Sequence, residues 1–307
     1  MSQNLLITGA TGKQGGAVIK ALLASPHAQA LTILALTRNP TSTSATTLAQ
    51  KAPNIILLKG DLNDCPAIFA FAAVPISAVF SVQLPFGSGA TPATEEKQGK
   101  ALIDAALAHG VQHFVYASVE RHGDDADTDP TDVPHFVSKY NIEKHLEART
   151  DRGARMSYTV LRPVAFMENV SPDFMGRMFV TMVKTSLSPG HKIQLVSTAD
   201  VGYFGAEALV RPDDARYRNV AIDLAGDELT FEEMSEVFGR VVGGRIPTTF
   251  ALLGQGLMWM MADLGIMFRW INAVGFNTDI GKVKEMHPKA MTFADWLAEK
   301  ENGWVKG

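Results

Sequence analysis

The sequence contains a single cysteine, Cys65, and therefore cannot form an internal disulfide. Its eight histidines include no His-Glu-x-x-His pair, and one thiol cannot build a thiolate zinc site, so we expect no metal centre. Neither sign of charge dominates, because 28 basic side chains stand against 32 acidic ones, giving a net charge of −4. This balance argues against direct binding to nucleic acid or to a membrane surface.

The sequence also lacks an uninterrupted apolar run of the length that a bilayer requires. Residues 249–273 are strongly apolar, but Gln255, Asp263 and Arg269 interrupt them, which favours a buried helix or an exposed apolar lid over a membrane anchor. The first residues show no basic segment followed by an apolar stretch, so we expect no secretory signal. Since a lone cysteine suits a reducing compartment, we expect a cytoplasmic protein.

What the sequence does contain is an alternation of short β-rich runs and helical patterns through its first half. With 307 residues, 46% of them hydrophobic, the chain can bury a large core. The alternation is typical of a parallel sheet with helices on both faces, and we expect a doubly wound α/β sheet in strand order 3-2-1-4-5-6, extended by one strand. The six runs lie at 5–7, 31–36, 55–58, 78–82, 114–117 and 158–161.

A glycine-rich turn, Gly9-Ala-Thr-Gly-Lys-Gln-Gly15, directly follows the first of these runs and opens a helical pattern. In such a turn the first glycine permits the tight bend, the second lets a pyrophosphate approach the backbone, and the third allows close helix packing. A P-loop is excluded, because no serine or threonine follows Lys13. We therefore expect a Rossmann dinucleotide site with cofactor contacts from Gly9, Thr11, Gly12, Lys13, Gln14 and Gly15.

Residues after the second and third runs indicate which dinucleotide is bound. Arg38 follows the second run, where an acidic residue would select NAD and an arginine accommodates the 2′-phosphate of NADP. Asp61 and Leu62 follow the third run, where a carboxylate could accept a hydrogen bond from the adenine amino group. Arg38 therefore predicts NADP as the cofactor.

The strand alternation weakens beyond Pro163, which gives the expected domain organisation. We assign residues 1–162 to an NADP-binding Rossmann domain, joined by a returning strand near 217–223. Residues 163–307 are assigned mainly to a smaller, mostly helical lobe for a substrate or a partner.

Taken together, short motifs spread over nearly the whole chain resemble the NmrA-like branch of the atypical short-chain dehydrogenases/reductases. They are Gly9-Ala-Thr-Gly-Lys-Gln-Gly15, Thr37-Arg-Asn-Pro40, Gly60-Asp-Leu62, His113-Phe-Val-Tyr-Ala-Ser118, His135-Phe-Val-Ser-Lys139, Arg162-Pro-Val-Ala-Phe-Met-Glu-Asn169 and Met291-Thr-Phe-Ala-Asp-Trp296. The family includes nucleotide-sensing regulators without demonstrated catalysis and is similar to reductases that keep one lysine. The resemblance implies further cofactor contacts at Lys139, Pro163 and Phe166.

One expected helix contains two candidates for the catalytic lysine, Lys139 and Lys144. Ordinary short-chain dehydrogenases use Tyr-x-x-x-Lys, which Tyr140 and Lys144 match, whereas the resemblance places Lys139 at the lysine position and His135 where the tyrosine would be. At 100° per residue, His135 and Lys139 share a face with the apolar residues 142 and 146. Tyr140 and Lys144 fall on the opposite, polar side, so we expect Lys139 to face the cofactor.

The resemblance also places Ser118, at the end of the fifth run, near Lys139 as a catalytic serine. His135 could replace the tyrosine as proton donor, because imidazole exchanges protons near neutral pH. Alternatively, His135 caps or packs the start of the helix after Pro134. Without the tyrosine, this face lacks the usual proton donor of carbonyl reduction.

The sequence is compatible with two functions. One is an NADPH-dependent reductase of a small, largely apolar carbonyl, enone or imine compound. The other is a non-catalytic sensor whose NADP occupancy changes its affinity for a protein partner. A substrate-sized pocket beside the nicotinamide would favour the enzyme, and an occluded nicotinamide face would favour the sensor.

Overall fold

A computed structural model describes residues 3–87, 89–250 and 262–304. The chain forms two compact units. The first comprises residues 1–118, 138–162 and 201–222, and the second comprises residues 119–137, 163–200 and 223–307. The chain therefore passes repeatedly between the units.

The main sheet has seven strands in the order β3-β2-β1-β4-β5-β6-β9, which confirms the expected doubly wound topology and its additional strand. Neighbouring strands from β3 to β6 pair in parallel. The strands are β1 (Gln3–Ile7), β2 (Leu31–Thr37), β3 (Ile55–Lys59), β4 (Ala78–Ser81), β5 (His113–Ala117), β6 (Ser157–Pro163) and β9 (Val220–Leu224). Because these strands are parallel, their carboxyl ends meet at one edge, where ligands bind in open α/β sheets.

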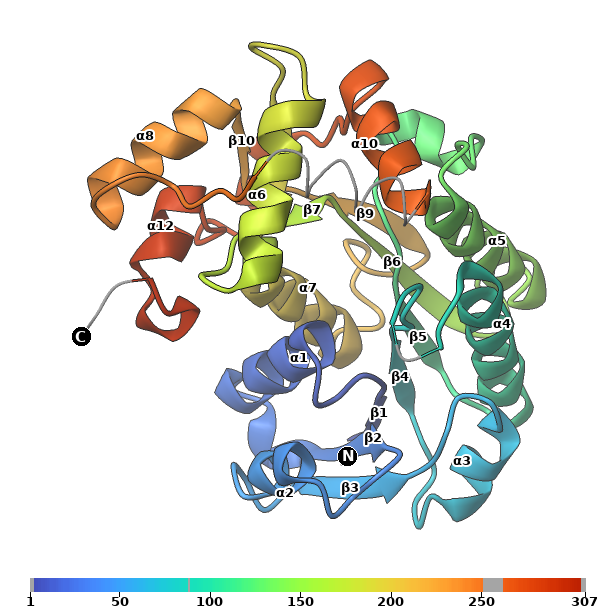
Figure 1. The fold of residues 1–307 in the computed structure, drawn as a ribbon. Coiled ribbons are helices and arrows are strands. Elements are labelled where there is room, and N and C mark those ends of the chain that lie inside the picture. Colours follow the sequence, from blue (N-terminus) through green and yellow to red (C-terminus); the bar gives the residue numbers. More distant parts are fainter. Residues whose placement is uncertain (1–2, 88, 251–261, 305–307) are drawn as a thin grey trace. The chain divides into compact units, whose positions relative to one another are not determined.

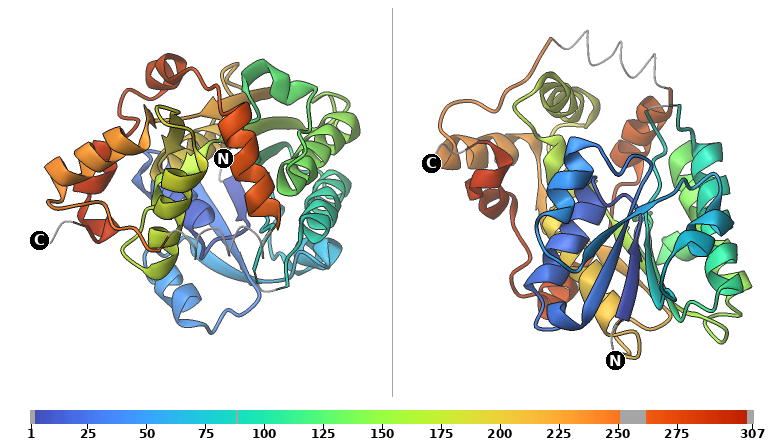
Figure 2. Two further views of the ribbon diagram at one scale, coloured as in Figure 1. Left: turned by 45° about the horizontal axis from the view of Figure 1, so that its top comes forward. Right: turned by 90° about the horizontal axis from the view of Figure 1, so that it is seen from below.

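Helices cover both faces of this sheet, as Figures 1 and 2 show for α1 on one side and α4 and α5 on the other. They are α1 (Lys13–Ala24), α2 (Thr43–Ala49), α3 (Cys65–Phe71), α4 (Pro92–Ala108), α5 (Pro134–Arg149) and α7 (Thr198–Val210). Glycines allow the closest contacts between neighbouring helices. A Cβ on Gly202 of α7 would lie 2.6 Å from the backbone of Ala17 in α1, and one on Gly99 of α4 would lie 2.6 Å from Ile142 of α5.

The second unit has its own core around a three-stranded sheet in the order β10-β8-β7. Its strands are β7 (Ala165–Phe166), β8 (Ile193–Val196) and β10 (Asp227–Leu229), and its helices are α6 (Phe174–Ser186), α8 (Phe231–Val241), α10 (Ala262–Ala273), α11 (Ile280–Met286) and α12 (Phe293–Ala298). Of the apolar stretch 249–273, residues 251–261 lie outside the described part of the chain. Within the described residues, none of the helices has the length and apolar character needed to cross a bilayer.

A buried histidine in β5 makes the stability of the first unit depend on pH. The two ring nitrogens of His113 lie 2.8 Å from Ser157 Oγ and 3.1 Å from Thr159 Oγ1. Burial, aided by the charge of Arg218, lowers the pKa of His113 to about 4. In the unfolded chain a histidine takes up its proton near pH 6.5, so the unfolded state binds more protons between these two values.

We therefore expect the free energy of unfolding to fall by up to about 3 kcal/mol as the pH is lowered from about 6.5 to 4. Urea unfolding measured across this window would test the expectation. A His113→Gln variant is the control, because it lacks the titrating group. Equal pH slopes for the variant and the parent chain would contradict it.

Candidate functional site

The glycine turn between β1 and α1 has the geometry of a phosphate-binding turn. Gly9 has φ +57°, in the left-handed region that favours glycine, and its carbonyl accepts a 2.8 Å hydrogen bond from the Gly12 N–H. A Cβ on Gly15 would lie 2.4 Å from the Gly9 carbonyl oxygen, so only glycine fits there. The turn therefore brings its backbone close to the first turn of α1.

The N-terminus of α1 is open to an anion. Its N-cap is Gly12, no side chain caps the helix, and its first turn carries no acidic residue. The first amides of a helix have no partners within the helix, and together with the helix dipole they favour a bound phosphate. The backbone of the glycine turn and the uncapped N-terminus of α1 together fit the pyrophosphate of a dinucleotide.

Thr8 joins this turn to the end of β4, where the strand order reverses. Its buried hydroxyl accepts a 2.7 Å hydrogen bond from the Val82 N–H and donates a 3.0 Å bond to the Val82 carbonyl. The next residue, Gln83, is buried, and its Nε2 donates to Ser81 Oγ at 2.9 Å. The hydroxyl of Thr8 thus holds the ends of β1 and β4 together.

Two buried amide oxygens at this edge have no hydrogen-bond partner among the described residues: Oε1 of Gln14, in the first turn of α1, and Oε1 of Gln83. An unsatisfied buried acceptor costs about 1–3 kcal/mol, so such atoms favour a ligand that carries donors. Hydroxyl and amide groups of a dinucleotide would supply them. Gln83 belongs to no recognised motif, and its place directly after an expected strand is the only signal of its role in the sequence.

The residues expected to choose the dinucleotide follow the neighbouring strands. Arg38, directly after β2, is exposed. Asp61 follows β3 and is partly exposed, as is Leu62; one carboxylate oxygen of Asp61 accepts a 2.9 Å hydrogen bond from the Asn63 N–H and so stabilises its own turn. Because β2 and β3 are adjacent parallel strands, these residues lie at the same edge of the sheet as the glycine turn.

Lys139 lies on the buried face of α5, where a carboxylate of α4 meets it. Its Nζ is 2.8 Å from Oε1 of Glu95, 3.4 Å from the carbonyl oxygen of Ala117 and 5.9 Å from the centre of the Tyr116 ring. Glu95 is fully buried and also accepts a 2.5 Å hydrogen bond from Ser138 Oγ. The ammonium therefore lies beside the carboxyl end of β5 and is paired with a buried carboxylate.

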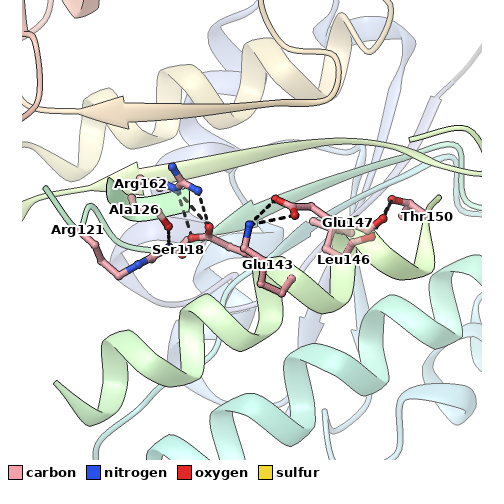
Figure 3. A network of polar contacts seen from close by, with 9 residues as sticks. Ser118, Arg121, Ala126, Glu143, Leu146, Glu147, Thr150 and Arg162 are labelled. Atoms are coloured by element: carbon pink, nitrogen blue, oxygen red, sulfur yellow. Dashed lines mark hydrogen bonds and ion pairs between the residues drawn. The ribbon is translucent and has the colours of Figure 1, made fainter. Parts of the chain in front are cut away.

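Ser118 directly follows β5 and belongs to a second buried network, shown in Figure 3. Its hydroxyl donates to Oε1 of Glu143, on α5. The other oxygen of Glu143 lies 2.7 Å from Nη2 of Arg162, on β6. Since Lys139 Nζ contacts the carbonyl of Ala117, the structure brings two of the three candidate catalytic side chains, Lys139 and Ser118, to the end of β5, each held by a glutamate.

The expected phase of α5 is confirmed by burial. His135, Lys139, Ile142 and Leu146 are buried, whereas Tyr140 and Lys144 are only partly so. The ammonium of Lys144 lies 5.4 Å from the centre of the Tyr140 ring and 3.0 Å from a carboxylate oxygen of Glu147. The Tyr-x-x-x-Lys match thus lies away from the face that carries Lys139.

Three other residues singled out in the sequence belong to the second unit. His135 Nδ1 lies 2.5 Å from Oδ1 of Asp263, in the first turn of α10. Pro163 ends β6, and Phe166 is a partly exposed residue of β7. The pairing of His135 with Asp263 joins residues 128 positions apart, so no local sequence pattern indicated it.

Cys65 is not a candidate nucleophile. It is buried at the first position of α3, and burial, together with the nearby charges of Asp64 and Asp61, raises the pKa of its thiol to about 12. A thiol in this state carries almost no thiolate at neutral pH.

The chain matches one protein family over nearly its whole length. Residues 1–297 match the model of the NmrA-like family. The chain is 28% identical over 251 residues to agroclavine dehydrogenase of Claviceps fusiformis, covering 75% of this chain and 77% of that protein.

Two solved structures are similar over nearly the whole chain. One is the NADPH-dependent quinone oxidoreductase QOR2 of Escherichia coli complexed with NADPH, with a TM-score of 0.70, 23% identity, and 97% and 100% of the two chains covered. The other is NmrA, a negative transcriptional regulator, in complex with NADP, with a TM-score of 0.71, 16% identity, and 98% and 97% covered. At these identities the likeness supports the fold.

Proposed function

The chain belongs to the NmrA-like family, and from this premise we propose that it binds NADP(H) at the glycine turn and reduces a small, largely apolar carbonyl, enone or imine compound. The observation that carries the proposal is the turn itself. Gly9 and Gly15 are required there by backbone conformation and by close approach, and the helix behind them begins without a side-chain cap. The similar structures of QOR2 and NmrA, crystallised with NADPH and NADP, support the same assignment.

In this proposal each part of the dinucleotide meets residues of matching chemistry. The pyrophosphate lies at the turn, between residues 9 and 15, and the 2′-phosphate meets the guanidinium of Arg38. Gln14 and Gln83 supply acceptor oxygens that would otherwise stay unsatisfied. Asp61, Leu62, Pro163 and Phe166 complete the expected contacts.

The reduced nicotinamide supplies a hydride, and the protein orients the reactants. Lys139 is assigned to the nicotinamide ribose because its ammonium lies at the end of β5. Ser118 and His135 are assigned to the reacting part of the acceptor. The carboxylates of Glu95, Glu143 and Asp263 then hold Lys139, Ser118 and His135 in fixed orientations.

We expect Arg38→Asp to erase or reverse a preference of the chain for NADPH over NADH. A charge-assisted contact to the 2′-phosphate should contribute about 1.5–3 kcal/mol, which corresponds to about a ten- to hundredfold difference in affinity. Calorimetric titration with both dinucleotides measures this difference. Lys51→Asp is the matched control, because Lys51 is also an exposed cation of the first unit but does not follow a strand. Equal affinity of the unmodified chain for the two dinucleotides would refute the role of Arg38.

A second candidate function is a non-catalytic NADP(H) sensor that binds a protein partner. The observation that favours it is the engagement of both Ser118 and Lys139 by buried carboxylates, which limits what either can offer to a carbonyl oxygen. Binding of NADPH without oxidation of the nicotinamide by any carbonyl, quinone or iminium compound would favour the sensor over the reductase.

A further inference from the structure

We propose that the preferred hydride acceptor is a cationic, iminium-type compound rather than a neutral carbonyl, and that Glu95 determines this preference. The inference rests on the proposed function and narrows its substrate class. Two separate networks carry it, one around Lys139 and one around Ser118.

The two acceptor classes make opposite electrostatic demands. A neutral carbonyl that receives a hydride at carbon becomes an alkoxide, so it needs a cation or a proton donor at its oxygen. An iminium ion that receives a hydride at carbon becomes a neutral amine, because the electron pair of the C=N π bond moves onto nitrogen. This second reaction consumes one hydride from NADPH, releases NADP⁺ and requires no proton. It does require that no uncompensated positive charge repels the acceptor.

The network around Lys139 meets the demand of the cationic acceptor. Its ammonium is 2.8 Å from the carboxylate of Glu95, which is fully buried and therefore poorly screened by water. At this separation the two charges nearly cancel for a molecule several ångströms away. The pair therefore offers little stabilisation to an alkoxide and little repulsion to a cation.

The network around Ser118 points to the same class. In a carbonyl reductase the serine hydroxyl would donate its hydrogen to the carbonyl oxygen, but here it donates to Glu143. The charge of Glu143 is in turn compensated by Arg162, at 2.7 Å. The tyrosine that ordinary short-chain dehydrogenases use is also missing from this face of α5, since Tyr140 lies on the other side beside Lys144. The hydroxyl of Ser118 and the ammonium of Lys139 are thus each engaged by a buried carboxylate, and the imidazole of His135, the remaining candidate donor, lies beside the carboxylate of Asp263.

Removing the charge of Glu95 should reverse the preference. Glu95→Gln keeps a hydrogen-bonding side chain of similar size for Ser138 but leaves the ammonium of Lys139 uncompensated. The uncompensated positive charge should repel a cationic acceptor and stabilise an alkoxide. We expect the ratio of kcat/KM for the cationic acceptor to that for the neutral acceptor to fall roughly ten- to a hundredfold.

The experiment uses the full chain, NADPH and two acceptors of similar size, an N-methyl dihydroisoquinolinium salt and the neutral ketone tetralone. Oxidation of NADPH is followed by its absorbance, and NADPH affinity is measured separately by calorimetry. Glu96→Gln is the matched control: Glu96 is the next residue of α4, but it contacts Lys100 and Asn141 instead of Lys139. Glu95→Asp, which keeps the charge, should retain the cationic preference.

The unmodified chain should reduce the iminium salt faster than the ketone, and only Glu95→Gln should shift the ratio. A general loss of structure would lower both rates and leave their ratio unchanged. The ratio therefore distinguishes an electrostatic effect of the substitution from a loss of folded protein. Tight NADPH binding with faster reduction of the ketone, or with reduction of neither acceptor, would overturn this inference and leave the cofactor assignment standing. Failure of the unmodified chain to bind NADPH would overturn both. If Glu95→Gln does not fold, the ratio measured for the unmodified chain and for Glu95→Asp still tests the preference for the cationic acceptor.

Discussion

Replacement of Gly12 by valine is expected to abolish NADPH binding while leaving the fold largely intact. The backbone of Gly12 (φ −92°, ψ 179°) is extended and open to any residue. A Cβ there would lie 3.2 Å from the Gly9 carbonyl oxygen, which is tight but tolerable. The branched side chain would, however, fill the space that a pyrophosphate must enter to reach the helix N-terminus. We expect affinity to fall at least a hundredfold in calorimetric titration.

Two neighbouring glycines provide controls for this variant. Gly16→Ala should bind NADPH normally, because its Cβ would make only an ordinary 3.5 Å contact with the Ala10 carbonyl. Gly15→Val should instead lose the fold as well, because its Cβ would lie 2.4 Å from the Gly9 carbonyl oxygen. Thermal unfolding separates these two kinds of loss. Unchanged NADPH affinity in Gly12→Val would mean that the cofactor binds elsewhere.

Lys139→Ala is expected to weaken NADPH binding, to remove turnover and to destabilise the first unit. It deletes the cation assigned to the nicotinamide ribose, and a lost positioned group of this kind costs roughly a hundredfold or more in rate. It also leaves Glu95 buried without its ammonium partner, which costs about 3–5 kcal/mol in the free energy of unfolding. Steady-state kinetics, calorimetry and urea unfolding measure the three effects.

A double variant and a neighbouring residue make this prediction specific. Lys139→Met combined with Glu95→Gln should recover much of the stability, because no buried charge is left unpaired, but it should not recover turnover. Tyr140→Phe should change turnover little, since Tyr140 lies on the side of α5 that carries Lys144. An inactive Tyr140→Phe beside a nearly normal Lys139→Ala would instead restore the ordinary Tyr-x-x-x-Lys mechanism.

Much of the fold could be predicted from the sequence because its signals are local. Each β-rich run lies between turn residues, so the six strands of the Rossmann core were predicted within a few residues of their observed ends. The phase of α5 was also readable, since the buried positions 142 and 146 repeat at helical spacing. The second, three-stranded sheet was not evident in the sequence, because its outer strands β7 and β10 span only two and three residues.

The sequence by itself determined the parallel sheet, the glycine turn and the face on which Lys139 lies, because backbone propensity and hydrophobic period act over a few residues. Only the tertiary structure decided what holds the candidate catalytic groups. Glu95 meets Lys139 across 44 positions, Glu143 meets Ser118 across 25, and Asp263 meets His135 across 128. Such pairs form when packing places one carboxylate of several beside a given side chain, and no local pattern distinguishes that carboxylate from the others. The charge around the candidate catalytic groups therefore depends on tertiary contacts rather than on any motif.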